Sequence, residues 1–342
     1  MTNPESILLS VVVITHKRLE PLVRCIGSVE ACRPPLPGEI VLVINGADAE
    51  TRGWAEKHAA SRPDFRWVEL ERSSKGRARN LGALSARGEW VYFIDDDVTV
   101  PPDIFFRMRE EMEAEPAAGV IGGPNSTPKD ATPFQRCVGR VLTSWLGTGR
   151  MRARYRPLGR RRAADDGDLI LCNLMFRRAL FQAGRPAFPE DFHYNEENVL
   201  LTRLKNDGVR LVYSPALEVF HERRNGWGGF LRQVWHSGVG RGHMWRRVPG
   251  SFRAVCAAPS LMVVYLLTLP WVRPGAIFLP LGVYLGFLGW EMARALWEDR
   301  LGVKGAGCVG LLISGAHMTY GAGLVCGFLR PGLNSPSAGR DT

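Results

Sequence analysis

The stretch Val91–Val98, which reads VYFIDDDV, is the most informative part of this chain. An apolar run suited to a strand is followed directly by three carboxylates, Asp95, Asp96 and Asp97. Alternation along an extended segment puts Asp95 and Asp97 on one face, and carboxylate oxygens are ligands that Mg2+ or Mn2+ prefers. Three adjacent anions repel one another, so a fold tolerates them at a strand end only if a cation is nearby. The stretch therefore predicts a strand end that holds a divalent metal and a phosphorylated substrate. The alternative is a solvated acidic turn that caps the next helix.

The chain ahead of this stretch alternates between strand-like and helix-like segments. The strand-like segments are Ile7–Thr15, Glu39–Ile44 and Phe65–Leu70, of which the first two are apolar runs rich in β-branched residues. The segments with helical spacing are Leu19–Ala31, Thr51–Ser61 and Gly76–Ala86. Such alternation is typical of parallel βαβ units, in which ligands bind at the carboxyl ends of the strands. We therefore expect Thr15, Asn45 and the three aspartates to converge in one cleft.

The order of these parts resembles the nucleotide-sugar domain of family 2 glycosyltransferases. The matching strings are THKR after the first strand, EIVLVI with its Asn-Gly turn, GRARNLGALSARGEW and VYFIDDDV, within residues 7–221. The resemblance implies an α/β fold of the GT-A type, Rossmann-like with a mostly parallel central sheet. It implies that Asp95 and Asp97 are the ends of a DXD-type element that binds the metal and the sugar-nucleotide diphosphate. Asp96 would then lie near the ribose or sugar.

The same resemblance assigns further residues to the nucleotide. Arg79 and Asn80 match an Arg-Asn pair in the helix before the acidic cluster, and Thr15 matches a contact in the first strand-end loop. The family commonly has an aspartate after the second strand, where this chain has Ile44-Asn45-Gly46. Recognition of the base would then fall to Asn45 or Asp48.

The string EENVLLTRLKNDGVRLVYSP provides a candidate for the general base. Two acidic residues in a first helical turn are ordinary without further context. However, the string resembles the family segment ED…L…R…G…P, whose acidic residue deprotonates the acceptor hydroxyl. Counted back from Arg203 and Gly208, Glu197 occupies that position, and Glu196 is its rival.

Basic residues follow in the next segment. His221 ends a short strand-like run, and both a structural role and a role as metal or diphosphate ligand stay open for it. Arg223, Arg224 and Arg241 are candidates for diphosphate contact, since guanidinium groups bind phosphate bidentately. The alternative for these arginines is a basic rim that faces anionic lipid. For the arginine-rich region 125–168, a mobile surface loop and a contact with acceptor phosphate or lipid are both open.

The C-terminal third is apolar. Ala254–Val272, Gly275–Trp290 and Gly305–Leu329 are uncharged, and a bilayer crossing takes about 20 residues. We predict two or three transmembrane helices. Basic residues cluster before the first segment and after the second, so the positive-inside rule places the catalytic domain in the cytoplasm and the Arg273-Pro274 turn outside. With three spans the C-terminal tail would also lie outside.

The predicted organisation has four parts. They are a GT-A domain at 1–226, an interfacial amphipathic segment at 227–250, the transmembrane helices at 251–330 and a disordered tail at 331–342. The start, MTNPES, has no basic segment typical of a secretory signal. The net charge of +10 suits phosphates and anionic headgroups. Since no nucleic-acid module is recognisable, we expect no nucleic-acid partner. The scattered cysteines indicate free thiols.

These observations predict a multi-pass protein of the cell membrane that acts as an inverting, metal-dependent glycosyltransferase of the hexosyltransferase type. It would use Mg2+ or Mn2+ to transfer sugar from a nucleotide-sugar donor to a hydroxyl of a lipid-linked or polysaccharide acceptor, in cell-envelope glycan or exopolysaccharide synthesis. Membrane lipids would be its other partners. The alternatives are a polyprenyl-phosphate glycosyltransferase, a nucleotidyltransferase and a membrane scaffold with a degenerate site.

Overall fold

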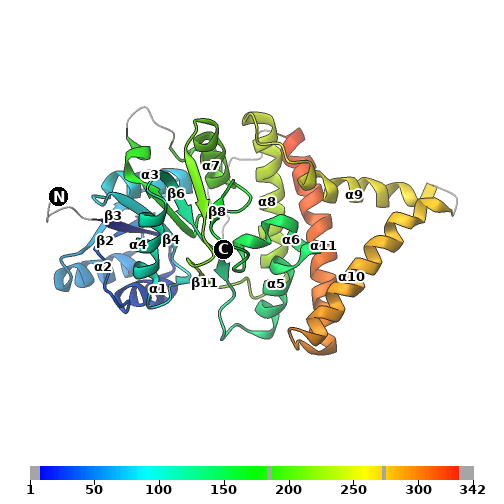
Figure 1. Ribbon diagram of the computed structural model, residues 1–342, viewed down its shortest axis with the longest axis horizontal. Coiled ribbons are helices and arrows are strands. Elements are labelled where there is room, and N and C mark those ends of the chain that lie inside the picture. The colour runs from blue at the N-terminus through cyan, green and yellow to red at the C-terminus, as the bar shows by residue number, and fades with distance from the viewer. Residues whose placement is uncertain (1–7, 183–186, 272–274, 331–342) are drawn as a thin grey trace. The chain divides into compact units, whose positions relative to one another are not determined.

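The protein is described by a computed structural model that covers residues 8–182, 187–271 and 275–330 (Figure 1). The chain divides into two compact units. The first consists of Met1–Ser126 and Arg156–His221, and the second of Thr127–Tyr155 and Glu222–Thr342. The predicted domain boundary at residue 226 lies close to the junction between His221 and Glu222. The segment Thr127–Tyr155, which the prediction placed in the catalytic domain, folds with the C-terminal helices instead.

An eight-stranded sheet forms the centre of the first unit. Its strands are β1 (Leu9–Thr15), β2 (Gly38–Asn45), β3 (Phe65–Leu70), β4 (Trp90–Asp95), β6 (Ala118–Gly122), β8 (Arg162–Ala163), β9 (Asn173–Arg177) and β10 (Arg210–Tyr213). Their order is β3-β2-β1-β4-β9-β6-β10-β8. The run β3-β2-β1-β4 is parallel throughout, while β9 is antiparallel to both its neighbours. The predicted mostly parallel α/β sheet is thus confirmed.

A second, three-stranded sheet carries part of the site. It contains β5 (Val98–Thr99), β7 (Asn125–Ser126) and β11 (Val219–His221), with β11 in the middle. The helices of this unit are α1 (Leu19–Glu30), α2 (Ala49–Ser61), α3 (Lys75–Ser85), α4 (Ile104–Ala114) and α7 (Glu196–Asn206). Asp48 and Ser74 begin α2 and α3 by accepting backbone hydrogen bonds from the first helical turn, as N-cap residues do.

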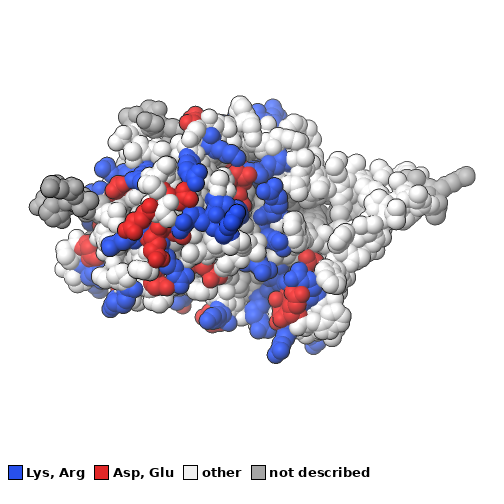
Figure 2. All heavy atoms as spheres, viewed as in Figure 1, with Lys and Arg blue, Asp and Glu red and all other residues white. Residues whose placement is uncertain are grey.

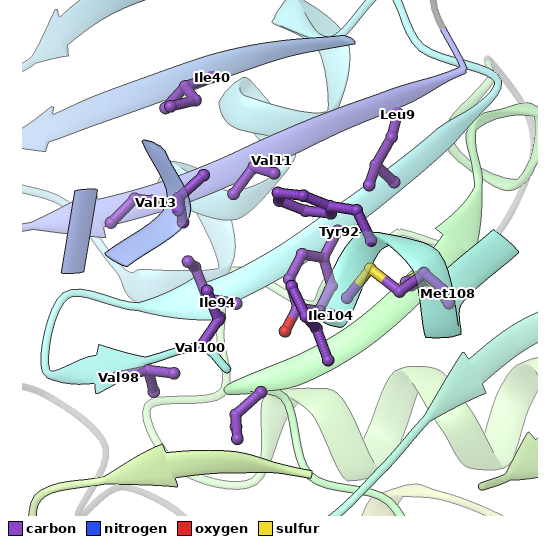
Figure 3. Packing of buried hydrophobic residues seen from close by; sticks show 14 of the residues in the cluster. Leu9, Val11, Val13, Ile40, Tyr92, Ile94, Val98, Val100, Ile104 and Met108 are labelled. Atoms are coloured by element: carbon purple, nitrogen blue, oxygen red, sulfur yellow. The ribbon is translucent and has the colours of Figure 1, made fainter. Parts of the chain in front are cut away.

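The buried core of the first unit ends where the acidic stretch begins. Val11 and Val13 of β1 and Tyr92 and Ile94 of β4 are buried in one cluster (Figure 3). Complete burial of such side chains contributes roughly 1.5–3 kcal/mol each. The apolar run of β4 ends at Ile94, and Asp95 then pairs in register with Ile14. The carboxylates thus start where the carboxyl ends of β1 and β4 lie side by side.

The second unit is helical, and its other helices pack on the long helix α11. Its helices are α5 (Pro133–Thr143), α6 (Trp145–Thr148), α8 (Trp227–Arg247), α9 (Ala258–Thr268), α10 (Leu279–Trp297) and α11 (Gly302–Leu329). Helix α8 occupies the predicted interfacial segment and packs closely on α11 through glycines. A Cβ at Gly242 would lie 2.3 Å from the Leu324 carbonyl oxygen, and one at Gly327 would lie 2.2 Å from that of Val239.

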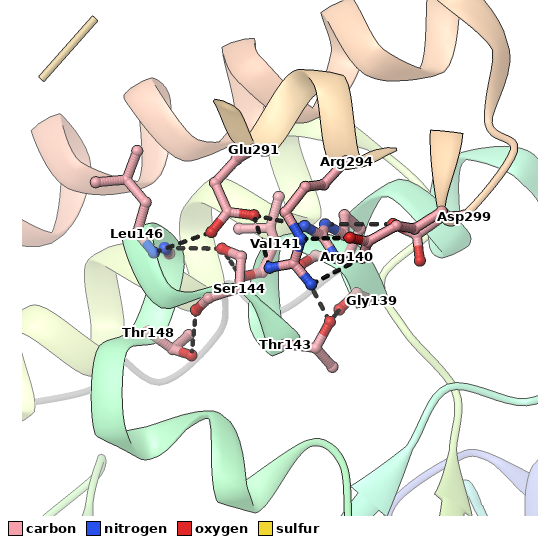
Figure 4. Close-up of polar contacts among 12 residues, drawn as sticks. Gly139, Arg140, Val141, Thr143, Ser144, Leu146, Thr148, Glu291, Arg294 and Asp299 are labelled. Atoms are coloured by element: carbon pink, nitrogen blue, oxygen red, sulfur yellow. Dashed lines mark hydrogen bonds and ion pairs between the residues drawn. The ribbon is translucent and has the colours of Figure 1, made fainter. Parts of the chain in front are cut away.

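A buried ion-pair network joins α5 to the end of α10 (Figure 4). Arg140 donates to Glu291 at 2.5 Å, and both side chains are almost fully buried. The Arg140 Nε also lies 3.3 Å from an Asp299 carboxylate oxygen, and Arg294 lies 4.0 Å from Glu291. A buried charge requires such partners, so this network specifies how α5 docks within the second unit.

Three helical segments in the described C-terminal region are long and apolar enough to cross a membrane. They are Ala254–Trp271, Ala276–Trp297 and Gly302–Leu329. The prediction left two or three spans open, and length and composition now qualify all three segments. The predicted Arg273-Pro274 turn and the tail 331–342 lie outside the described residues.

Candidate active site

Asp96 is the most buried carboxylate of the acidic stretch. It follows the end of β4 and accepts a hydrogen bond from the Thr15 hydroxyl at the end of β1, at 2.7 Å. Burial raises the pKa of Asp96 to about 7, and the charges of Asp97 and Asp95 act in the same direction, although Arg18 opposes them. The structure therefore brings Thr15 and the acidic stretch together at one strand edge, as the sequence led us to expect.

Arg18 is a site residue that the sequence reasoning missed. It lies in the THKR segment after β1, and its guanidinium donates to Asp96 at 2.7 Å and to Asp97 at 2.8 Å. Burial would lower the pKa of Arg18, but Asp97 and Asp96 raise it above its ordinary value. Arg18 thus supplies part of the positive charge that three consecutive aspartates require. The signal for it was a basic residue in the first strand-end loop.

Asp95, Asp97 and His221 form a cluster suited to a metal ion. One ligand atom from each lies within 4.8 Å of those of the other two. His221 reaches the cluster because β11 pairs with β5, with His221 opposite Val98. Its Nε2 lies 3.0 Å from the Asp97 Oδ1. Two carboxylates and an imidazole are a donor set that Mn2+ and related divalent ions accept, so these residues fit the predicted metal.

The pKa of Asp97 shows the strength of this arrangement. Burial alone would raise it, but the charge and hydrogen bond of His221, together with Arg18, outweigh burial and lower the pKa below its ordinary value. Asp97 is therefore held as a carboxylate at neutral pH. An ionised carboxylate is the form that binds metal.

Arg79 links the acidic stretch to the candidate base region. It lies on α3 and is buried, with one guanidinium nitrogen bonded to the Glu196 carboxylate and another 3.8 Å from Asp95. Burial would lower the pKa of Arg79, but Glu196 and Asp95 raise it. The close approach of α3 to the 187–190 segment needs Gly76, since a Cβ there would lie 2.3 Å from the Pro189 carbonyl oxygen.

The two rival glutamates lie in different environments. Glu196 is 4% exposed and bonded to Arg79. Glu197 is half-buried, and its carboxylate accepts a hydrogen bond from the Asn198 amide at 3.2 Å. Both begin α7. Glu196 is thus committed to a buried ion pair, and Glu197 is the more accessible carboxylate of the two.

The side-chain amides of Asn45 and Asn80 form hydrogen bonds with backbone groups of distant segments. Asn45 donates to the Ser73 carbonyl at 3.1 Å and accepts from the Ser73 N–H at 3.0 Å. Asn80 makes the same pair of bonds with Phe188, at 2.9 and 3.0 Å. Asp48 accepts hydrogen bonds from the Thr51 hydroxyl and backbone N–H. Nucleotide contact by these residues stays a prediction.

The predicted diphosphate arginines belong to the second unit. Arg223 is buried, donates to the Thr127 hydroxyl at 3.1 Å and lies over the Tyr155 ring at 5.5 Å. Arg241 is buried within α8, and Arg224 is exposed. Their contact with phosphate remains a prediction.

The first unit is a GT-A-like α/β domain with an acidic site at the carboxyl edge of its parallel strands. A model of glycosyl transferase family 2 matches residues 10–185, which is more than half of the 342-residue chain. The chain therefore belongs to glycosyl transferase family 2. This match confirms the predicted family and, for the matched domain, the predicted enzyme class.

Solved structures share the fold. PcManGT, a mannosyltransferase from Pyrobaculum calidifontis solved with GDP-Man and Mn2+, is similar with a TM-score of 0.58 at 18% identity, over 95% of this chain and 88% of that chain. TarS 1–349 of S. aureus, solved with UDP-GlcNAc, has a TM-score of 0.51 at 14% identity, over 93% of this chain and 91% of that chain. At these identities the likeness shows the fold alone.

Curated proteins share part of the sequence. The uncharacterized glycosyltransferase EpsJ of Bacillus subtilis (strain 168) is 28% identical over 55% of this chain and 53% of the relative. The succinoglycan biosynthesis protein ExoO of Rhizobium meliloti (strain 1021) is 36% identical over 32% of this chain and 30% of the relative. This chain thus spans about half or less of the length of these relatives.

Proposed function

We propose that this protein is a membrane-attached, inverting and metal-dependent glycosyltransferase. It transfers a sugar from a nucleotide-sugar donor to a hydroxyl of a polysaccharide or lipid-linked acceptor. The observation that carries the proposal is the convergence of Asp95, Asp97 and His221 within 4.8 Å at the carboxyl end of β4. The succinoglycan protein among its relatives supports a polysaccharide acceptor, and the three apolar helices support membrane attachment.

The residues of the site divide the chemistry between them. Asp95, Asp97 and His221 would hold Mn2+ or Mg2+, which when bound supplies positive charge for the departing nucleoside diphosphate. Arg79 adds positive charge beside Asp95. Arg18 keeps Asp96 and Asp97 oriented through its two hydrogen bonds. The site thereby stabilises charge that develops as the donor bond breaks.

Glu197 is the proposed general base. As the acceptor oxygen attacks the anomeric carbon, the bond from that carbon to the diphosphate breaks and the hydroxyl proton passes to the Glu197 carboxylate. A single in-line displacement inverts the anomeric centre. A positioned base of this kind contributes about 10²–10⁴-fold to the rate. Glu196 is less suited to the role because Arg79 already holds its carboxylate.

The test is donor turnover by the full chain, purified in detergent. UDP-, GDP- and dTDP-sugars are screened with Mn2+ or Mg2+, and the anomeric configuration of the product is read by NMR. Asp97→Asn is expected to abolish metal-dependent turnover. Asp103→Asn is the matched control, because Asp103 is a partly exposed acid that pairs with Arg107 on α4. Absence of both turnover and nucleotide binding across all donors would overturn the proposal.

Glu197→Gln separates the proposal from its nearest alternative. Loss of about 10²-fold or more in rate supports an acceptor hydroxyl. A near-full rate would instead favour a polyprenyl-phosphate acceptor, since an ionised phosphate needs no base.

A further inference from the structure

The three candidate spans differ in how far the protein itself covers them. In their apolar windows, 11% of residues are buried for Ala254–Trp271 and 6% for Ala276–Trp297, against 44% for Gly302–Leu329. We call the first two segments, with α9 and α10, the hairpin arms. In Figure 1 α8 and α11 run side by side, whereas the arms contact α11 over part of their length, as Ser260 does at Gly321, and then lead away from it. The first two segments are therefore largely uncovered by protein, whereas α11 is partly covered by it.

The hairpin arms have the composition of a lipid-facing surface. Residues 254–272 and 275–290 contain no Asp, Glu, Lys or Arg, and Figure 2 shows this part of the second unit without charged atoms on the visible face. Large apolar side chains are more than half exposed along both arms, among them Leu261, Val264, Leu267, Val283, Leu285 and Phe287. Such exposure over consecutive turns is stable only in a non-aqueous surrounding.

The C-terminal end of α11 is bonded to the C-terminal end of α8. Arg246 donates to the Phe328 carbonyl at 2.9 Å, and the His243 ring lies 3.3 Å from the Arg330 carbonyl oxygen. Helix α8 ends at Arg247, just before the first arm begins at Ala254. The end of α11 therefore lies on the side from which the first arm enters the membrane.

The N-terminal end of α11 is held on the same side. On α5, the Cys137 thiol lies 3.7 Å from the Gly305 carbonyl oxygen of α11. Arg140, also on α5, binds Glu291 and Asp299 at the end of the second arm. Basic residues gather at these ends, with Arg246, Arg247 and Arg253 before the first arm, Arg294 in the last turn of the second, and Arg300 and Lys304 after it. The positive-inside rule places both ends in one compartment.

We infer that α11 does not cross the bilayer, and that the chain meets lipid through the hairpin arms alone. Helices α8 and α5 pack along α11 in addition to its contacts with the arms, and both ends of α11 lie on the side of the membrane from which the first arm starts. If α11 crossed the membrane, its end could stay bonded to α8 only if α8 crossed as well. That would draw buried Arg241 and exposed Arg232 toward the hydrocarbon core, where arginine is strongly disfavoured. The inference rests on the proposed membrane attachment.

A reporter fused after Thr342 of the full chain tests the inference in a bacterial host. Green fluorescent protein fluoresces in the cytoplasm, and alkaline phosphatase is active outside it. The same reporters at the N-terminus define the side of the catalytic unit. We expect fluorescence and no phosphatase activity from the C-terminal fusions. Phosphatase activity without fluorescence would overturn the inference and leave the proposed function standing. Full recovery in the soluble fraction would instead overturn membrane attachment itself.

Two matched leucines test which helix contacts lipid. Leu267 of the first arm is 69% exposed, and Leu311 of α11 is 65% exposed. Leu267→Asp is expected to reduce the fraction retained in membranes after alkaline carbonate washing by about threefold or more, because a buried charge in lipid is costly. Leu311→Asp should change that fraction by less than about 1.5-fold. Equal loss from both variants would place α11 in lipid and overturn the inference.

Discussion

Replacement of Glu196 by alanine should destabilise the protein more than it affects the chemistry. Glu196 is 4% exposed, and its carboxylate is the close partner of the buried Arg79 guanidinium. Without Glu196, the carboxylate described near the Arg79 guanidinium is that of Asp95, at 3.8 Å. Removal of one member of a buried ion pair costs about 3–5 kcal/mol. Because Asp95 still offers partial compensation, we expect about 3 kcal/mol here.

Urea unfolding of the full chain in detergent, followed by tryptophan fluorescence, measures this loss. With a slope of about 2 kcal/mol per molar urea, the unfolding midpoint should fall by about 1.5 M. Glu197→Ala is the matched control, since Glu197 is the adjacent, more accessible acid. It should shift the midpoint by less than about 0.5 M but reduce the transfer rate. The double variant Arg79→Met with Glu196→Met should regain part of the stability.

Two results would refute this reasoning. An unchanged midpoint in Glu196→Ala would mean that the buried pair does not contribute to stability. A folded Glu196→Gln variant that loses about 10³-fold in rate, beside an active Glu197→Gln, would make Glu196 the base.

Further changes test other parts of the structure. Burial would raise the pKa of Asp48, but hydrogen bonds from Thr51 lower it. Asp48→Ala should therefore lower the free energy of unfolding by about 1 kcal/mol at neutral pH. This difference between wild type and variant should shrink as the pH falls below about 4, because the wild-type carboxylate becomes protonated. A difference that persists at pH 2 would contradict this. Gly327→Val should cost about 1–3 kcal/mol through its clash with α8, whereas Gly307→Val, with open space around its Cβ position, should stay within about 0.5 kcal/mol; thermal unfolding in detergent compares them. Glu291→Gln should cost about 3 kcal/mol by leaving Arg140 underpaired, and equal stability of mutant and wild type would count against the network. Treatment with EDTA should abolish donor turnover, and added Mn2+ should restore it; turnover that survives chelation would argue against metal dependence.

Local patterns in the sequence were sufficient for the parallel half of the sheet. The β-branched runs predicted β1 and β2, the alternation with helical segments predicted β3, and the apolar run before the aspartates predicted β4. Parallel strands place their carboxyl ends at one edge, which is why contact between the β1 and β4 ends could be expected. The hydrogen bond from Thr15 to Asp96 is the result.

Contacts that depend on distant pairings were harder to predict. His221 reaches Asp97 only through the register of β11 against β5, two very short strands far apart in the chain. The sequence marks Arg18 only as a basic residue in the first strand-end loop, and its bonds to Asp96 and Asp97 depend on how the fold places those carboxylates. Likewise, region 125–168 was left open as a mobile surface loop or a contact with acceptor phosphate or lipid, and helix α5 within it was not predicted.

The membership of α5 in the second unit affects how the protein can be made. Its buried residues Cys137, Val138 and Val141 pack in one cluster with Val309 and Leu312 of α11. During synthesis α5 leaves the ribosome more than 150 residues before α11. Its apolar face therefore stays uncovered until α11 has been made. A truncation after His221 would leave that face permanently uncovered. Recombinant catalytic fragments that keep Thr127–Tyr155 but lack α11 should therefore aggregate, and replacement of this insertion by a short polar linker is the more rational route to a soluble fragment.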